Sequence, residues 1–192
     1  MASEAGIRSL VKKAKGRDPE AFGMLYDEYV DQIFRYVYYK VGNLVESQDL
    51  TGHTFLKAFE NIDSYEMRDV AFSSWLYRIA HNLVVDFFRR ESRRESVPID
   101  EQPPTPSPRG NPVETVLADL ESERLYKAMQ RLTHNQREVL VLKFIDNLSN
   151  AQVAEIMGIS VGAVKSTQKR GLLSLNRILG NSSGTDYLER GA

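Results

Sequence analysis

Six of the seven prolines in this chain lie between Val97 and Pro112, in the segment "SVPIDEQPPTPSPRGNP". Proline lacks a backbone N–H and fixes φ, so this segment cannot continue a helix and is typical of an extended linker. On both sides of it apolar residues recur at spacings of three and four, which indicates amphipathic helices, and no strand pattern is present. The sequence therefore predicts an all-α fold, with two small helical domains at residues 1–94 and 112–180 and a flexible linker at residues 95–111.

Three helices are expected before the linker. Asp18-Pro19 is a start signal for the first, which Gly42-Asn43 ends. The second is predicted from about Glu46 to Asn61 and the third from about Phe72 to Glu91. Their predicted inward faces are Phe22, Leu25, Tyr26, Tyr29, Ile33, Phe34 and Val37, then Leu50, Phe55, Phe59 and Ile62, then Trp75, Ile79, Leu83 and Phe87.

Four more helices are expected after the linker. Asn111-Pro112 opens one that runs to about Arg131, and Thr133 with Gln136 forms a capping box for the next. Two shorter helices follow, from Ser149 to Met157 and from Ser160 to about Leu179. Residues 181–192 are expected to be a disordered tail.

Charge is strongly segregated along a chain whose net charge is only −1. Ten acids and three bases lie between Asp18 and Glu66, whereas five arginines and two acids lie between Arg78 and Arg94. No acid occurs from Ile156 to Thr185. This pattern indicates two kinds of partner, one protein-like and one polyanionic.

The basic segment near the C-terminus has the layout of a helix-turn-helix. Gly158 lies at the expected turn and Ser160 can cap the second helix. That helix is predicted to bury Val161, Val164, the stem of Gln168, Leu172 and Leu175, and to expose Gly162, Ala163, Lys165, Ser166, Lys169 and Arg170. Basic side chains beside small residues suit contact with the phosphates and the base edges of DNA. A merely solvated basic face is the alternative.

A second candidate surface lies on the helix before the linker. Asn82, Asp86, Arg89 and Arg93 share one face of it, and the loop that precedes it, from Tyr65 to Phe72, contains aromatic residues. Asn and Arg are partners of bases and phosphates, and unpaired bases stack on aromatic rings. An ordinary amphipathic surface helix beside a loop explains the same residues.

Several function classes lack support in the sequence. There is no cysteine, and Asp49 with His53 supplies only half a metal site, because His81 and His134 stand alone. Phosphate-cradling glycine loops, nucleophile elbows and paired carboxylates are absent. We expect no metal, no cofactor and no enzymatic activity. Without a signal-peptide core or a bilayer-long apolar run, a cytoplasmic location is expected.

Taken in order, the motifs resemble those of one family. "TFLKAF", "SWLYRIAHN", a proline-rich linker and "GISVGAVKS" follow one another as in the extracytoplasmic-function (ECF) sigma factors, which have only sigma regions two and four. The resemblance covers roughly Asp18 to Arg94 and Asn111 to Leu179. It implies that residues 1–94 bind core RNA polymerase and recognise and melt the −10 element, and that residues 112–180 read the −35 element.

The resemblance also implies roles for particular residues. The polymerase-binding positions would be Gln48, Asp49, Leu50, His53 and Leu56. The −10 contacts would be Tyr65, Arg68, Trp75, Asn82, Asp86, Arg89 and Arg90. The −35 contacts would be Gly162, Lys165, Ser166, Lys169 and Arg170. The implied partners are core RNA polymerase, promoter DNA and an anti-sigma factor, and the free protein would be a monomer.

Two departures from the family pattern bear on these roles. The chain has Gln48, Gly52 and His53 where the family usually has an acid and a glutamine nearby, and Thr167 where it often has arginine. A stand-alone helix-turn-helix regulator is the main alternative function, although it gives the aromatic loop and "SWLYRIAHN" no role. A decoy that binds polymerase without promoter activity is a second alternative.

Overall fold

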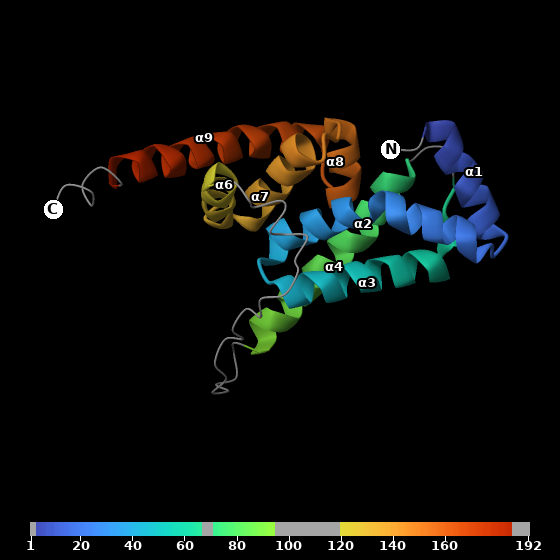
Figure 1. The fold of residues 1–192 in the computed structure, drawn as a ribbon. Coiled ribbons are helices and arrows are strands. Elements are labelled where there is room, and N and C mark those ends of the chain that lie inside the picture. Colours follow the sequence, from blue (N-terminus) through green and yellow to red (C-terminus); the bar gives the residue numbers. More distant parts are fainter. Residues whose placement is uncertain (1–2, 67–70, 95–119, 186–192) are drawn as a thin grey trace. The chain divides into compact units, whose positions relative to one another are not determined.

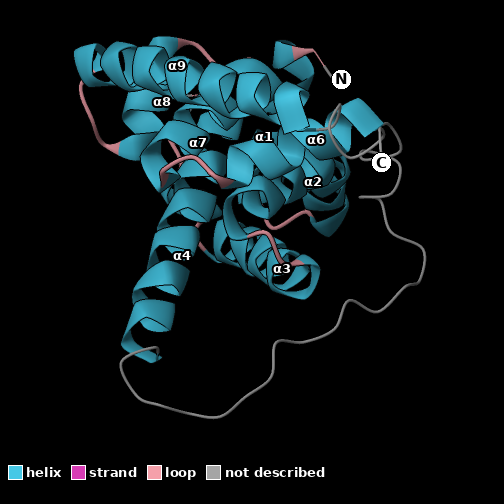
Figure 2. Cartoon of the chain, turned by 90° about the vertical axis from the view of Figure 1, so that its left-hand side faces the viewer, coloured by secondary structure: helices cyan, strands magenta, loops and turns pink. Residues whose placement is uncertain are grey.

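The computed structural model describes residues 3–66, 71–94 and 120–185, and every regular element in these ranges is a helix (Figures 1 and 2). The chain splits into two compact units. Helices α1 to α4 belong to the first, here called the N-terminal unit, and α6, α7, η2 and α9 to the second, the C-terminal unit. The all-α prediction is confirmed. The predicted linker at 95–111 and the helix start at Asn111-Pro112 lie outside the described residues. None of the described helices is long and apolar enough to cross a membrane.

Helix α1 (Glu4–Lys15) packs along α2 through one apolar stripe. Ser3 caps it, since its Oγ accepts a hydrogen bond from the Gly6 N–H at 3.2 Å. Ile7, Val11 and Ala14 are buried, at the spacings of four and three expected of a helix face. Figure 1 shows α1 beside α2.

Helices α2 (Pro19–Val41) and α3 (Leu44–Glu60) have clear end signals. The Asp18 carboxylate accepts hydrogen bonds from the Glu20 and Ala21 N–H groups at 3.0 and 3.1 Å, and Gly42 ends α2 with φ 80°, so both predicted ends are confirmed. Asn43 caps α3, which therefore begins two residues before the predicted start.

The predicted core face of α2 is right at Leu25, Ile33 and Val37, which are fully buried. It is wrong at Tyr26, which is 41% exposed. The ring of Tyr26 lies edge-on to Phe55, with centroids 4.8 Å apart, so it covers the core from outside.

Helix α4 (Phe72–Arg94) follows the short turn η1 (Ile62–Ser64) and packs on α2 and α3. Its predicted stripe is right only at Leu83, because Trp75, Ile79 and Phe87 are half-buried. The apolar side chains that are buried are Phe72, Leu76, Tyr77, Ala80, Leu83 and Val84. Strict spacing by fours drifts around a helix of 3.6 residues per turn, and the true stripe alternates fours and threes.

The C-terminal unit begins with α6 (Leu120–Gln130) and α7 (His134–Leu140), which continues into the π-helical turn η2 (Val141–Ile145). The predicted capping box at the start of α7 is present, with Thr133 and Gln136 bonded reciprocally. Helix α7 packs closely on α9 (Val161–Thr185). Gly171 permits this approach, because a Cβ there would lie 3.3 Å from the Leu140 side chain.

The predicted inner face of α9 was wrong in two places. Val161 and Leu172 are each 41% exposed, whereas Val164, Thr167 and Gly171 form the buried line at spacings of three and four. Leu172 follows Gly171 by one residue and is therefore turned about 100° away from it. The helix also runs to Thr185, past the predicted end at Leu179 and into the segment expected to be disordered. Residues 186–192 lie outside the described residues.

Candidate nucleic-acid and protein interfaces

The helix-turn-helix segment has the turn and cap that its sequence predicts. Helix α8 (Asn150–Met157) is followed by Gly158, whose φ of 65° lies in the left-handed region that glycine adopts without strain. The Ile159 N–H donates to the Ala154 carbonyl at 3.0 Å, and the Ser160 Oγ accepts from the Ala163 N–H at 3.1 Å. These contacts fix where α9 begins and hence which of its side chains face outward.

The predicted −35 residues on α9, namely Gly162, Lys165, Ser166, Lys169 and Arg170, are all exposed. Ala163, expected outside with them, is half-buried. Lys165 and Lys169 are one turn apart and share a face. The Arg170 guanidinium donates to the Thr167 Oγ1 at 3.3 Å, and Thr167 is 8% exposed. The surface therefore presents two exposed ammonium groups, from Lys165 and Lys169, and one guanidinium held by a buried hydroxyl. These groups can bind phosphates and base edges.

The predicted polar face of α4 is also exposed. Asn82, Asp86, Arg89 and Arg93 all lie at the surface of the N-terminal unit. The Arg89 Nη1 lies 3.4 Å from the Asp86 Oδ1, so each side chain helps to orient the other. Both are more than half exposed, and the pair therefore adds little stability. The pair presents a guanidinium beside a carboxylate, on the same side of the helix as the Asn82 amide.

Aromatic residues around the start of α4 form a cluster. The ring centroids of Tyr65, Phe72 and Trp75 lie 5.2 to 5.6 Å from one another, and Tyr29 joins at 5.7 Å from Phe72. Tyr65 is only 5% exposed, so its predicted role as an open base-stacking residue needs correction: it supports the cluster. Trp75 is half-buried and is the predicted contact with an accessible ring. Arg68 lies outside the described residues.

We expect the N-terminal unit to lose stability in alkali through this cluster. Burial, with smaller contributions from the Glu28 carboxylate and Tyr65, raises the pKa of Tyr29 to about 12. As pH rises, Tyr29 ionises in the unfolded chain before it ionises in the folded one. Its contribution to the free energy of unfolding is therefore complete below about pH 10 and is lost as pH rises toward about 12. The unfolding free energy at about pH 9 and about pH 11 should therefore differ less in Tyr29→Phe than in the wild type. Equal losses in both proteins would contradict this.

The predicted polymerase-binding residues lie on α3. Gln48, Asp49, His53 and Leu56 are exposed, and the side chain of Leu56 is a large apolar one at 53% exposure. Leu50 is 3% exposed, so it is corrected from a direct contact to a support beneath them. His53 Nδ1 lies 3.4 Å from Asp49 Oδ2. Across residues 3–66, 71–94 and 120–185, no group of three His, Cys, Asp or Glu side chains could hold a metal ion.

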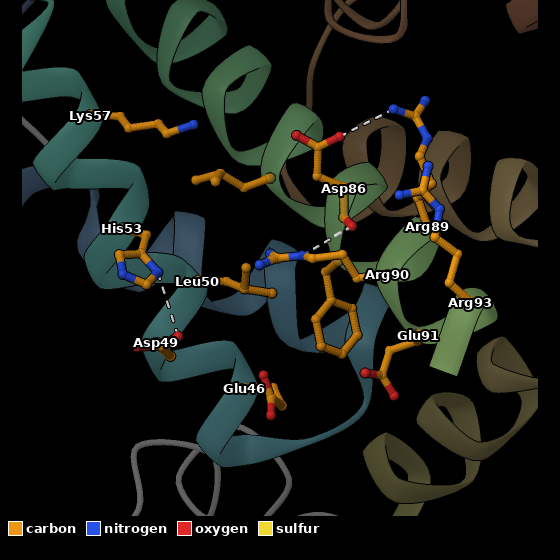
Figure 3. Close-up of a pocket in the computed structure, with 12 residues that line it drawn as sticks. Glu46, Asp49, Leu50, His53, Lys57, Asp86, Arg89, Arg90, Glu91 and Arg93 are labelled. Carbon is orange, nitrogen blue, oxygen red and sulfur yellow. Dashed lines mark hydrogen bonds and ion pairs between the residues drawn. The ribbon is translucent and has the colours of Figure 1, made fainter. Parts of the chain in front are cut away.

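A groove of about 770 Å³ lies between α3 and α4, a feature that the sequence did not reveal (Figure 3). Leu50, Leu83 and Phe87 supply its apolar residues. Its charged and polar residues are Glu46, Asp49, His53 and Lys57 on α3 and Asp86, Arg89, Arg90, Glu91 and Arg93 on α4. The spacing of charges on each helix could be read from the sequence, but the pairing of α3 with α4 could not.

Both halves of the chain match models of known protein families. Residues 25–94 match the model described as Sigma-70 region 2, and residues 122–175 match Sigma-70, region 4. The first match spans most of α2 and all of α3 and α4, and the second spans the helix-turn-helix. The candidate surfaces on α3, α4 and α9 fall within these matched segments.

Characterised relatives are similar over nearly the whole chain. The ECF RNA polymerase sigma factor BldN of Streptomyces coelicolor is 36% identical, over 93% of this chain and 67% of its own. SigW of Bacillus subtilis, also an ECF RNA polymerase sigma factor, is 33% identical, over 92% of this chain and 98% of its own.

Two solved structures have a similar fold. CnrH, solved with the cytosolic domain of CnrY, gives a TM-score of 0.68 at 24% identity, covering 92% of this chain and 98% of that one. The sigma factor RpoE of Bartonella quintana, solved with the anti-sigma factor NepR, gives 0.67 at 23% identity, covering 83% and 96%. At these identities the likeness concerns the fold.

Proposed function

The chain belongs to the ECF sigma factors, and on that premise we propose how its surfaces divide the work of binding core RNA polymerase and directing it to specific promoters. The observation that carries the proposal is the order of the two matched sigma regions, each bearing an exposed surface with suitable chemistry. Members of this family are regulatory subunits, so RNA synthesis itself falls to the polymerase.

Helix α3 is the polymerase-docking element in this proposal. Gln48, Asp49, His53 and Leu56 present mixed polar, charged and apolar groups to a protein partner, and buried Leu50 holds their helix in place. The acidic segment from Asp18 to Glu66, which contains α3, repels DNA, so that stray DNA binding to this surface without polymerase is weak.

Two other surfaces read the promoter. On α4, Asn82 with the Asp86–Arg89 pair, beside the partly open ring of Trp75, recognises the −10 element and holds an unstacked base. On α9, Lys165, Ser166, Lys169 and Arg170 contact the −35 element, and the small Gly162 lets the backbone approach the groove. This division assigns residues 1–94 to polymerase docking and −10 recognition, and the residues after the linker to −35 recognition.

The setting of the protein follows from its partners. The protein works in the cytoplasm, where core polymerase and promoter DNA are found, and is a monomer when free. An anti-sigma factor regulates it, as supported by RpoE of similar fold, which was solved with the anti-sigma factor NepR. No cofactor takes part, and the protein has no enzymatic activity of its own.

Binding of a promoter library with and without core polymerase tests the function. The purified protein should bind core polymerase, and only that complex should retain particular promoters. Tight, selective DNA binding by the protein alone would favour a stand-alone helix-turn-helix regulator. Binding to polymerase that never selects a promoter would indicate a decoy.

Removing the Thr167 hydroxyl should weaken −35 recognition. Thr167→Val keeps nearly the same volume but loses the oxygen that accepts from Arg170, so the arginine is no longer held for DNA. We expect the polymerase-bound protein to bind its −35 element about three- to tenfold more weakly, measured by titration of fluorescent promoter DNA. Thr167→Ser keeps the hydroxyl and should bind as the wild type does. An equal loss in Thr167→Ser would contradict the positioning role.

A further inference from the structure

Neighbouring arginines on α4 point in different directions. Arg89 also lines the groove between α3 and α4, but its guanidinium pairs with the Asp86 carboxylate at 3.4 Å. The Arg90 Nε donates to the Asp86 carbonyl at 3.4 Å, and Figure 3 shows its guanidinium directed into the groove, toward Leu50 and His53 of α3. The family resemblance assigns both arginines to −10 DNA, but their geometry separates them.

The groove that receives Arg90 has the chemistry of a polypeptide site. Leu50 and Leu83 are buried, Phe87 is half-buried, and together they form an apolar floor that an apolar side chain of a partner could cover. Glu46 and Asp49 on the α3 wall would repel the phosphates of a DNA strand. Each wall carries acidic and basic side chains together, which suits a protein segment that itself carries both signs of charge.

The groove is also continuous with the proposed docking surface. Asp49 and His53, two of the predicted polymerase contacts, line its α3 wall. A partner seated on α3 would therefore reach the α4 wall without any change in the N-terminal unit. Two adjoining patches, one on each helix, then make a single interface.

We propose that this groove binds a segment of core RNA polymerase, with a polymerase carboxylate paired to Arg90 and an apolar polymerase side chain on the floor formed by Leu50, Leu83 and Phe87. The inference rests on the proposed function and extends its polymerase interface from α3 onto α4. It moves Arg90 from the DNA-reading surface to the polymerase-binding surface, and it leaves Arg89 and Asn82 with the DNA.

Charge reversal at Arg90 tests the proposal. In the absence of DNA, Arg90→Glu should weaken binding to core polymerase by about tenfold or more, because it puts two carboxylates together. Lys12→Glu makes the same charge change at an exposed position of α1 outside the groove and should bind as the wild type does. Thermal melts establish that the variants are folded.

The opposing outcomes are distinct. If Arg90→Glu binds core polymerase as tightly as the wild type and loses only promoter binding, the arginine is a DNA contact and the inference fails. If the wild-type protein does not bind core polymerase, both the proposed function and this inference fail.

A second measurement does not depend on affinity. The chain has no cysteine, so Arg90→Cys provides a single site for a small fluorescent label. Its emission should change when core polymerase alone is added, before any promoter DNA is present. A label at position 90 that responds only to DNA would overturn the proposal.

Discussion

Replacing Arg137 with methionine is expected to lower the free energy of unfolding of the C-terminal unit by about 3 kcal/mol. The Arg137 guanidinium closes the end of α6, where it donates to the carbonyls of Met129 at 3.0 Å, Gln130 at 2.7 Å and Leu132 at 3.4 Å. The last carbonyls of a helix have no partner within it, and here a charged group supplies one.

Burial makes this contact costly to lose. Arg137 is 6% exposed, and desolvation lowers the pKa of its guanidinium. Methionine fills similar space but leaves the carbonyls without a donor. Urea denaturation of the full chain, followed by hydrogen exchange of amides in α7 and α9, reports on this unit. Arg131→Met, at an exposed position nearby, should change stability by no more than about 0.5 kcal/mol. Equal effects of the two variants would contradict the capping role.

Removing Lys165 and Lys169 together should reduce −35 binding by about ten- to a hundredfold at low salt. Each lysine that contacts a phosphate releases counterions, so the slope of log affinity against log salt concentration should fall by about two in the double alanine variant. The measurement is a titration of the polymerase-bound protein with promoter DNA at several salt concentrations.

Arg177 supplies the control for this variant. It is an exposed base on the same helix, three turns past Lys165, and is not among the predicted DNA contacts. Arg177→Ala should leave the salt slope unchanged. If it lowers the slope as much per charge as the lysine variant does, the basic helix acts as a diffuse patch and the assignment of Lys165 and Lys169 is wrong.

Local chemistry explains which parts of this fold the sequence could predict. The caps at Asp18 and Thr133 depend on a few neighbouring residues, and the turn at Gly158 depends on one glycine. Each was predicted because its cause lies within three or four residues of its effect.

Features that depend on packing were predicted less well. The burial of Tyr65 and the exposure of Val161 and Leu172 are decided by neighbours distant in sequence, which hydrophobicity alone does not identify. The groove between α3 and α4 needs both helices in place. The helical period already separates the directions of Arg89 and Arg90, but the sequence does not show that Arg90 meets α3 across a groove.

Transcription with purified bacterial core polymerase, this protein and a pooled library of random promoters tests the central claim most directly. We expect specific start sites that share −10 and −35 sequences, and we expect Asn82→Ala or Lys165→Ala to reduce the transcripts from them. Their sequences would identify the promoter class at once. A protein that fails to bind core polymerase, or that binds it and yields no specific transcripts, would contradict this account.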